Sequence, residues 1–261
     1  MTTGTLHGRN VVITGGGRGI GAAIAVTLAE SGAQVLAAAR SADQIEAVAS
    51  SLRDRGLQAL ATTCDVADPE SIESLAQTAA QDLGDVDILV NNAGIATSAP
   101  LHRLTLEEWN RILTVNVTGT FLCTKAFAPA MAERGWGRVI NIGSVLSRTG
   151  AKYVSAYAAS KHAMLGFTRC IAAEMGERGV TVNAICPGWV ATELVTKAIE
   201  NIMSKTGMSH DEAEATILAD TPQHRALDPV EVAQMALLLC QEGGRGINGQ
   251  AIGMDGGSFL G

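Results

Sequence analysis

A glycine-rich turn between an apolar run and an alanine-rich run constrains the fold of this chain more than any other feature. Residues 11–14 read Val-Val-Ile-Thr and predict a buried strand, and residues 22–29 have the composition of a helix. Strand, tight turn and helix in this order begin a dinucleotide-binding α/β unit. A pyrophosphate binds to backbone N–H groups at such a helix N-terminus, and Gly15, Gly19 and Gly21 place no Cβ in its way.

The end of the second predicted strand, residues 34–39, indicates which dinucleotide is preferred. A carboxylate there would accept a hydrogen bond from the ribose 2′-hydroxyl and favour NAD. This chain instead has Arg40 after the strand, and it has Arg18 inside the glycine turn. Two guanidinium groups suit a 2′-phosphate, so the sequence favours NADP(H). Arg40 could also stack on the adenine, which leaves NAD(H) open.

A second group of residues, in the middle of the chain, has the chemistry of a proton donor. Tyr157 and Lys161 are four residues apart, so on a helix they share one face with about 5–6 Å between their Cβ atoms. The ammonium is expected to lower the pKa of the phenol, which is ordinarily about 10. A phenol tuned toward neutral pH can exchange a proton with a substrate oxygen, and Ser144 can hydrogen-bond the same oxygen.

Together these segments resemble the short-chain dehydrogenase/reductase family, in its single-domain branch. Further matching positions follow in the family's order along nearly the whole chain. They are Asp65, the run Asn91–Gly94, Asn116, Pro187–Gly188 with Thr192, and Asp255–Gly257. Each short match alone has little weight, whereas the ordered set is specific.

The resemblance implies a hydride-transfer enzyme with the catalytic residues Asn116, Ser144, Tyr157 and Lys161. Tyr157 would be the acid in ketone reduction and the base in alcohol oxidation, and Lys161 would also hold the nicotinamide ribose. Ser144 would polarise the substrate carbonyl, and Asn116 would hold a water. The implied cofactor contacts are Gly15, Arg18, Gly19, Ile20, Gly21, Arg40, Asp65, Val66, Asn92, Ala93, Gly94, Tyr157, Lys161, Pro187, Gly188, Val190 and Thr192.

Alternating strand-like and helix-like segments predict one α/β domain over residues 1–261, a Rossmann-type doubly wound parallel sheet with helices on both faces. Residues 8–145 or so would form its cofactor-binding part. Strands are expected at 10–14, 34–39, 58–63, 87–91, 137–142, 181–186 and 250–254. Helices are expected at 19–31, 42–55, 69–83, 105–133, 156–176 and 229–241. The resemblance implies seven strands in the order 3-2-1-4-5-6-7.

Residues 189–222 are the candidate substrate lid. Apolar residues recur at helical spacing from Leu194 to Ile202 and give one apolar face. That face either packs on the core or closes over a bound ketone and excludes water. The candidate substrate contacts are Leu146, Tyr153, Trp189 and Met203.

The substrate class follows from apolar positions in this predicted pocket. Ala96 and Leu146 stand where relatives that act on short hydroxyacids have polar side chains. An unpaired carboxylate there would be costly, which favours NADPH-dependent reduction of a 3-oxoacyl thioester or of a cyclic or aryl ketone. Arg148 or Lys152 could instead supply a cation. The alternative is an NAD-dependent dehydrogenase of a secondary alcohol, 3-hydroxyacyl compound or cis-diol.

A protein that only binds or senses a nucleotide is a third class, and the complete set of four catalytic residues argues against it. The net charge of −7 argues against nucleic acid as a partner. The chain has no apolar run long enough for a membrane helix, and residues 1–9 lack the core of a signal peptide.

Cysteines, histidines and helix pairing indicate the setting of the protein. The five cysteines form no C-x-x-C pair, which favours free thiols in a reducing cytoplasm, and the scattered histidines suggest no metal site. By resemblance, the helices at 105–133 and 156–176 would pair between subunits to form a homotetramer or a homodimer. A small-molecule ketone or alcohol is the remaining expected partner.

Overall fold

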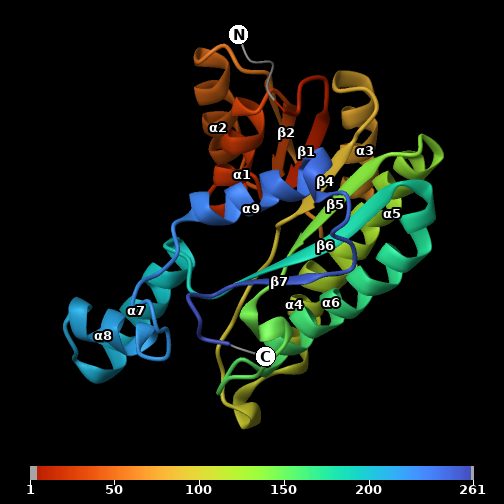
Figure 1. The fold of residues 1–261 in the computed structure, drawn as a ribbon. Helices are drawn as coiled ribbons and strands as arrows, with labels where there is room; N and C mark the ends of the chain where they lie inside the picture. Colours follow the sequence, from red (N-terminus) through yellow and green to blue (C-terminus); the bar gives the residue numbers. More distant parts are fainter. Residues whose placement is uncertain (1–4, 260–261) are drawn as a thin grey trace.

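Seven parallel strands form one sheet, in the order β3-β2-β1-β4-β5-β6-β7, in the computed structural model, which describes residues 5–259 (Figure 1). The strands are β1 Asn10–Thr14, β2 Gln34–Ala39, β3 Ala59–Thr63, β4 Ile88–Asn91, β5 Gly137–Ile142, β6 Val180–Pro187 and β7 Ala251–Met254. Every expected strand is present, with each end within one residue of its prediction, and the implied strand order is confirmed. Residues 1–4 and 260–261 of the predicted domain lie outside this description.

Nine α-helices connect the strands in the described part of the chain. They are α1 Gly19–Glu30, α2 Ala42–Asp54, α3 Pro69–Asp82, α4 Leu106–Leu113, α5 Gly119–Glu133, α6 Ser155–Met175, α7 Glu193–Thr206, α8 His210–Leu218 and α9 Pro229–Cys240. The expected uniform helix over 105–133 is interrupted. A π-helical turn, Thr114–Thr118, separates α4 from α5, and Asn116 is its one buried residue. Such turns are frequent at functional sites.

The core has two layers because successive strand residues point to opposite faces of the sheet. Val11 and Ile13 pack with residues of α1, α2 and α9 on one face, and Val12 packs with residues of α3 and α5 on the other. This arrangement confirms the doubly wound fold, with helices covering both faces.

Helices α7 and α8 form a hairpin that stands out from the body of the molecule at the lower left of Figure 1. The hairpin has its own small apolar cluster of Val195, Ile199 and Ala213. The apolar face expected in the lid therefore packs mainly on α8. Leu194, on the same helix, remains half exposed.

Candidate active site

The glycine turn after β1 has a backbone that only glycine fits at two positions. Gly15 has a φ of +66°, and a Cβ on Gly21 would lie 2.2 Å from the Gly15 carbonyl oxygen. Helix α1 then begins at Gly19 with no side-chain cap and no acidic residue in its first turn. Its first N–H groups are therefore not capped by the Arg18 side chain, which leaves them available to a dinucleotide pyrophosphate.

Thr14 and Asn92 hold this turn against the end of β4. Thr14 Oγ1 accepts hydrogen bonds from the backbone N–H groups of Asn92 and Ala93, both at 3.1 Å. The Asn92 amide donates back to the carbonyl oxygens of Thr14 and Gly15, both at 3.0 Å. Asn92, a predicted cofactor contact, thus positions the glycine turn in this structure. Thr14 was absent from the predicted contacts, although a polar residue ending an apolar strand is a visible signal.

The residues predicted at the adenosine end lie along the same edge of the sheet. Arg40 is exposed, follows β2, and makes no ion pair within residues 5–259. Arg18 is exposed too, but it forms an ion pair with Glu193 at the start of α7. The Asp65 carboxylate accepts a hydrogen bond from the Ala67 N–H at 3.0 Å, which orients it after β3 next to the buried Val66.

Ser144 follows β5 and begins a short 3₁₀ turn, Val145–Ser147. Its hydroxyl oxygen accepts a hydrogen bond from the Leu146 N–H, and its own N–H donates to Ser147 Oγ, both at 3.1 Å. Ser144 is buried, and its side chain forms a hydrogen bond with the Tyr157 phenol. The 3₁₀ turn therefore holds Ser144 in one orientation beside Tyr157.

Lys161 is buried, and its ammonium donates a hydrogen bond of 2.7 Å to the Ile142 carbonyl oxygen. Burial lowers the pKa of Lys161 to about 8, an effect that the nearby Cys186 thiol partly opposes. Ile142 is the last residue of β5, so this hydrogen bond holds the ammonium at the end of the strand that Ser144 follows. The sequence pattern indicated neither this carbonyl partner nor the role of Cys186.

Burial reverses one expectation about Tyr157. Desolvation raises the pKa of the phenol; the Ser144 side chain partly opposes this, and the Cys186 thiol adds to it. The Lys161 Nζ atom lies 5.6 Å from the centre of the Tyr157 ring and is engaged with Ile142. The net shift is therefore opposite to the predicted lowering, because desolvation of the phenol outweighs the stabilisation that a nearby ammonium can give, and Tyr157 keeps its proton at neutral pH.

Asn116 connects the π-helical turn to the segment after β4. Its amide oxygen accepts from the Ile95 N–H and its amide nitrogen donates to the Ile95 carbonyl, both at 2.9 Å. The nitrogen also donates to Ser160 Oγ at 3.0 Å. Gly94 lies between the amide and the ammonium: a Cβ there would be 3.3 Å from Asn116 Oδ1 and 3.7 Å from Lys161 Nζ. The structure thus brings all four predicted catalytic residues into one region.

The end of β6 connects this region to the lid. Gly188 donates its N–H to the Met254 carbonyl at 2.9 Å, and Val190 pairs with Leu227. Thr192 follows, and its methyl carbon would lie 3.2 Å from a Cβ on Gly19. Thr192, in the segment where the sequence predicts nicotinamide contacts, therefore lies against the glycine turn at the base of α7.

The four predicted substrate contacts have different surroundings. Leu146 is half-buried on the 3₁₀ turn beside Ser144. Tyr153 is 59% exposed, and its carbonyl accepts from the Ala99 N–H. Trp189 is 37% exposed at the base of the lid. Met203 packs against the α7–α8 cluster, so it belongs to the hairpin interior.

Comparisons with known proteins agree with this geometry. The family pattern described as short chain dehydrogenase matches residues 9–202. The chain is 38% identical over 255 residues to 3-oxoacyl-[acyl-carrier-protein] reductase FabG of Vibrio cholerae, covering 98% of this chain and 99% of that protein. It is 35% identical over 253 residues to D-beta-hydroxybutyrate dehydrogenase of Cupriavidus necator, covering 97% and 98%. Actinorhodin polyketide ketoreductase, crystallised with NADPH, superimposes with a TM-score of 0.92 at 36% identity, covering 96% and 97%.

Fold, site and relatives together define an oxidoreductase that interconverts a ketone and a secondary alcohol. The chain belongs to the short chain dehydrogenase family. The predicted family and reaction class are thereby confirmed.

None of the helices within residues 5–259 is both long enough and apolar enough to span a membrane. The same residues contain no group of three or more His, Cys, Asp or Glu side chains arranged to hold a metal ion.

Proposed function

We propose that this protein reduces a 3-oxoacyl-thioester-type ketone, or a cyclic or aryl ketone, with NADPH. The observation that supports this direction is the Tyr157 phenol, whose pKa is raised by burial. A phenol that holds its proton at neutral pH is prepared to act as an acid, which reduction requires. Oxidation requires the phenolate as a base, which the same burial disfavours.

Each of the four catalytic residues has a task in this proposal. Bound nicotinamide supplies the hydride, and the protein supplies position and a proton. Ser144 donates a hydrogen bond to the ketone oxygen and holds it beside Tyr157. Tyr157 then gives its proton to that oxygen. Lys161, protonated below a pKa of about 8, supplies the positive charge that stabilises the phenolate left behind.

Asn116 is a positioning residue in this scheme. Its amide holds the Ile95 backbone on both sides, and it keeps Gly94 close to the Lys161 ammonium. The water that Asn116 was expected to hold, as a path for proton return to Lys161, remains part of the proposal.

NADP(H) is the proposed cofactor because of Arg18 and Arg40. Both guanidinium groups are exposed at the edge where the adenosine ribose would lie, and a 2′-phosphate can bind them bidentately. The similar polyketide ketoreductase was crystallised with NADPH, which supports the same choice. The cofactor contacts would come from residues 15–21, 40, 65–66, 92–94 and 187–192, with Tyr157 and Lys161 at the nicotinamide ribose.

The apolar side chain of Leu146 beside Ser144 supports a neutral ketone over a small carboxylate. Two of the similar proteins are named for such substrates: one is a 3-oxoacyl-[acyl-carrier-protein] reductase and the other is a polyketide ketoreductase. The α7–α8 hairpin within residues 189–222 is the proposed lid over such a substrate. A second candidate is NAD-dependent oxidation of a secondary alcohol, favoured by the similarity to D-beta-hydroxybutyrate dehydrogenase.

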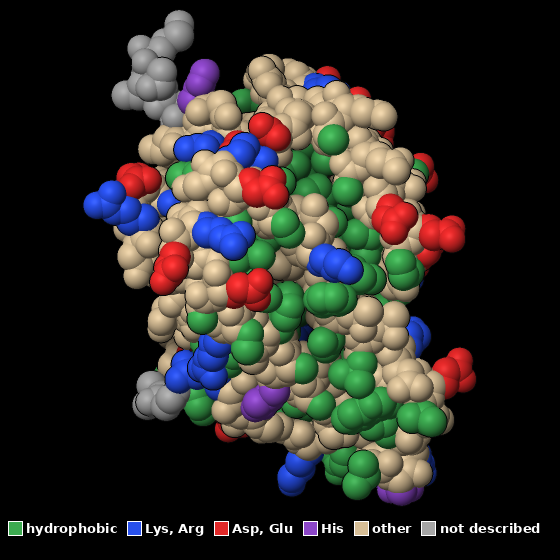
Figure 2. All heavy atoms as spheres, turned by 90° about the vertical axis from the view of Figure 1, so that its right-hand side faces the viewer, with side chains coloured by type: hydrophobic (Ala, Val, Ile, Leu, Met, Phe, Trp, Pro, Cys, Tyr) green, Lys and Arg blue, Asp and Glu red, His purple; other side chains and the backbone are tan. Residues whose placement is uncertain are grey.

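A homotetramer, or a homodimer, is the proposed assembly. Figure 2 shows the face of the molecule on the α5 and α6 side, where hydrophobic side chains gather. Phe121 of α5 is 43% exposed there and packs edge-on against Phe167 of α6 at 6.1 Å. Helix pairing across this face would bury both rings. We also propose that residues 1–261 form one domain that acts in the cytoplasm.

The test is a panel of ketones and alcohols assayed with NADPH, NADH and their oxidised forms, read by absorbance of the reduced cofactor. NADPH-dependent turnover of a 3-oxoacyl thioester or an aryl ketone is the expected result. Tyr157→Phe should lower this turnover by about 10²–10⁴-fold and leave NADPH binding, measured by fluorescence, unchanged. Faster turnover of a secondary alcohol with NAD than of any ketone with NADPH would select the second candidate.

A further inference from the structure

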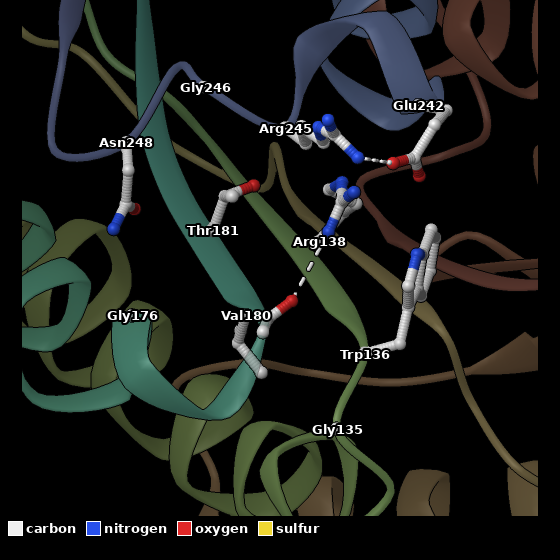
Figure 3. A pocket seen from close by; sticks show the side chains of 11 residues that line it. Gly135, Trp136, Arg138, Gly176, Val180, Thr181, Glu242, Arg245, Gly246 and Asn248 are labelled. Carbon is white, nitrogen blue, oxygen red and sulfur yellow. Dashed lines mark hydrogen bonds and ion pairs between the residues drawn. The ribbon is translucent and has the colours of Figure 1, made fainter.

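A cavity of about 480 Å³ opens at the edge of the sheet where β5 and β6 begin. Ser144 follows the opposite, carboxyl end of β5, and Lys161 is hydrogen-bonded to Ile142 at that end, so the cavity is separate from the candidate active site. Figure 3 shows the side chains that line it, among them Trp136, Arg138, Thr181, Glu242 and Arg245. Arg138 and Thr181 are directly paired in the register of β5 and β6, and therefore point to the same face of the sheet.

Arg138 is a buried cation that forms no ion pair in the described part of the chain, although the nearby Glu242 carboxylate partly opposes the lowering of its pKa by desolvation. It is only 3% exposed, and none of the ion pairs formed within residues 5–259 includes it. Its Nη1 donates to the carbonyl oxygens of Gly137 at 2.8 Å and Gly179 at 3.3 Å, while its Nε has no hydrogen-bond partner. Burying an ionised group without its counter-charge is costly, so an anion beside Arg138 would stabilise the structure.

Other groups around Arg138 add to the positive character of the cavity. Arg245 lies at the rim and pairs with Glu242 at 3.0 Å, and this glutamate is the one carboxylate in the lining. Two guanidinium groups contact the Trp136 ring: the Cζ atom of Arg138 lies 4.3 Å from the ring centre, and that of Arg9 lies 3.6 Å from it. Arg9 is itself paired with Asp87. The lining therefore has two guanidinium groups, Arg138 and Arg245, and one carboxylate, Glu242, which leaves an excess of one positive charge.

Two donors remain available to a ligand. Because only Nη1 of Arg138 is engaged and Arg138 lines the cavity, Nη2 can donate into it. The Thr181 hydroxyl is in the wall and makes no hydrogen bond in the described part of the chain. A planar guanidinium beside a hydroxyl suits an oxyanion.

We propose that this cavity binds the carboxylate or phosphate group of a small molecule. Arg138 is the buried cation, Thr181 donates a second hydrogen bond, and Arg245 closes the rim. The volume lies within the range of about 300–1,000 Å³ typical of small-molecule sites. The anionic group is therefore part of a molecule larger than inorganic phosphate. Anion binding in this cavity is independent of the proposed ketone reduction.

Binding is tested on the full-length protein by isothermal titration calorimetry, with pyrophosphate for the phosphate arm and citrate for the carboxylate arm. Chloride at matched ionic strength controls for general screening. Saturable binding of either anion is expected, and the arm that binds more tightly identifies the chemistry. Thr181→Val and Arg245→Gln should each weaken that binding by about two- to tenfold, because the first removes a hydrogen-bond donor and the second removes an exposed positive charge at the rim.

Arg55→Gln is the matched control, because Arg55 is also an exposed arginine paired with a glutamate, Glu30, and belongs to neither site. It should leave the affinity for the anion unchanged. A loss of binding in Arg18→Gln without a loss in Thr181→Val would place the anion at the cofactor turn and overturn the proposal. Equal binding by all variants would mean an adventitious ion only, and absence of saturable binding by either anion would also reject the site.

Discussion

Arg18, in the glycine turn before α1, forms an ion pair with Glu193, the first residue of α7. The same glutamate pairs with Lys197 one helical turn later. Lys197 and Arg18 together lower the pKa of the Glu193 carboxyl. A proposed cofactor residue is thus connected to the proposed lid. The two positions are 175 residues apart in the sequence.

Glu193→Gln should tighten NADPH binding, because the carboxylate competes with the 2′-phosphate for the Arg18 guanidinium. The pair is exposed and screened by solvent, so the dissociation constant is expected to fall only about two- to fivefold. Binding of NADH, which lacks the 2′-phosphate, should not change. Fluorescence titration with both cofactors measures the effect. Glu200→Gln, on the same helix but outside any ion pair of the described residues, is the control, and an equal gain there would refute the competition.

Arg40→Gln should reduce kcat/KM for NADPH by about tenfold, the effect expected from losing one charged hydrogen bond to a phosphate. Turnover with NADH should change little. Steady-state kinetics with both cofactors test this, with Arg55→Gln as a control because Arg55 is an exposed arginine paired with Glu30 in the same half of the chain. Undiminished use of NADPH by Arg40→Gln would remove Arg40 from the cofactor site.

Ketone reduction should decline as the pH rises through about 8, where the buried Lys161 loses its proton. Below that pH the ammonium is present and stabilises the phenolate that remains after proton donation. Above it, Lys161 is neutral while Tyr157, whose pKa is raised, still holds its proton, so the loss of rate belongs to Lys161. The pH dependence of kcat measures this transition. A rate that stays constant to pH 10 would contradict the assignment.

The same lowered pKa has a consequence for stability. In the unfolded chain Lys161 has its ordinary value of 10.5, so between pH 8 and 10.5 the unfolded state binds a proton that the folded state does not. The contribution of Lys161 to the free energy of unfolding therefore rises with pH across this window. Chemical denaturation of the natural protein and of Lys161→Met at pH 7, 8, 9 and 10 should give curves whose difference follows that slope.

Gly21→Ala should destabilise the protein by about 1–3 kcal/mol, as overpacking does, because the new Cβ would lie 2.2 Å from the Gly15 carbonyl oxygen. NADPH binding should be lost with it, since the turn must open to accept the methyl group. Gly246→Ala is the matched control: that glycine has open space around its Cβ position. Chemical denaturation of both variants checks the expectation, and equal stability would disprove the steric argument.

Local pattern was sufficient for the strands and for the selection of Tyr157 and Lys161 as candidate catalytic residues. The apolar runs at β1 and β4, the glycine spacing before α1 and the four-residue interval between Tyr157 and Lys161 are all properties of short segments. Hydrophobic periodicity and turn chemistry act within about ten residues. That is why strand ends were predicted to within one residue, and why the family could be identified by the order of its motifs.

The tertiary structure alone decided the electrostatics of the site and its long-range partners. Burial raises the pKa of the Tyr157 phenol, against the lowering that its spacing from Lys161 predicts, because desolvation depends on what covers a group in three dimensions. Packing of distant elements produces the ion pair of Arg18 with Glu193 and the hydrogen bond from Lys161 to Ile142. It also buries the Arg138 Nε without a hydrogen-bond partner. Sequence determines which residues are present and which elements they form, and the packed fold determines how much of their charge water can reach.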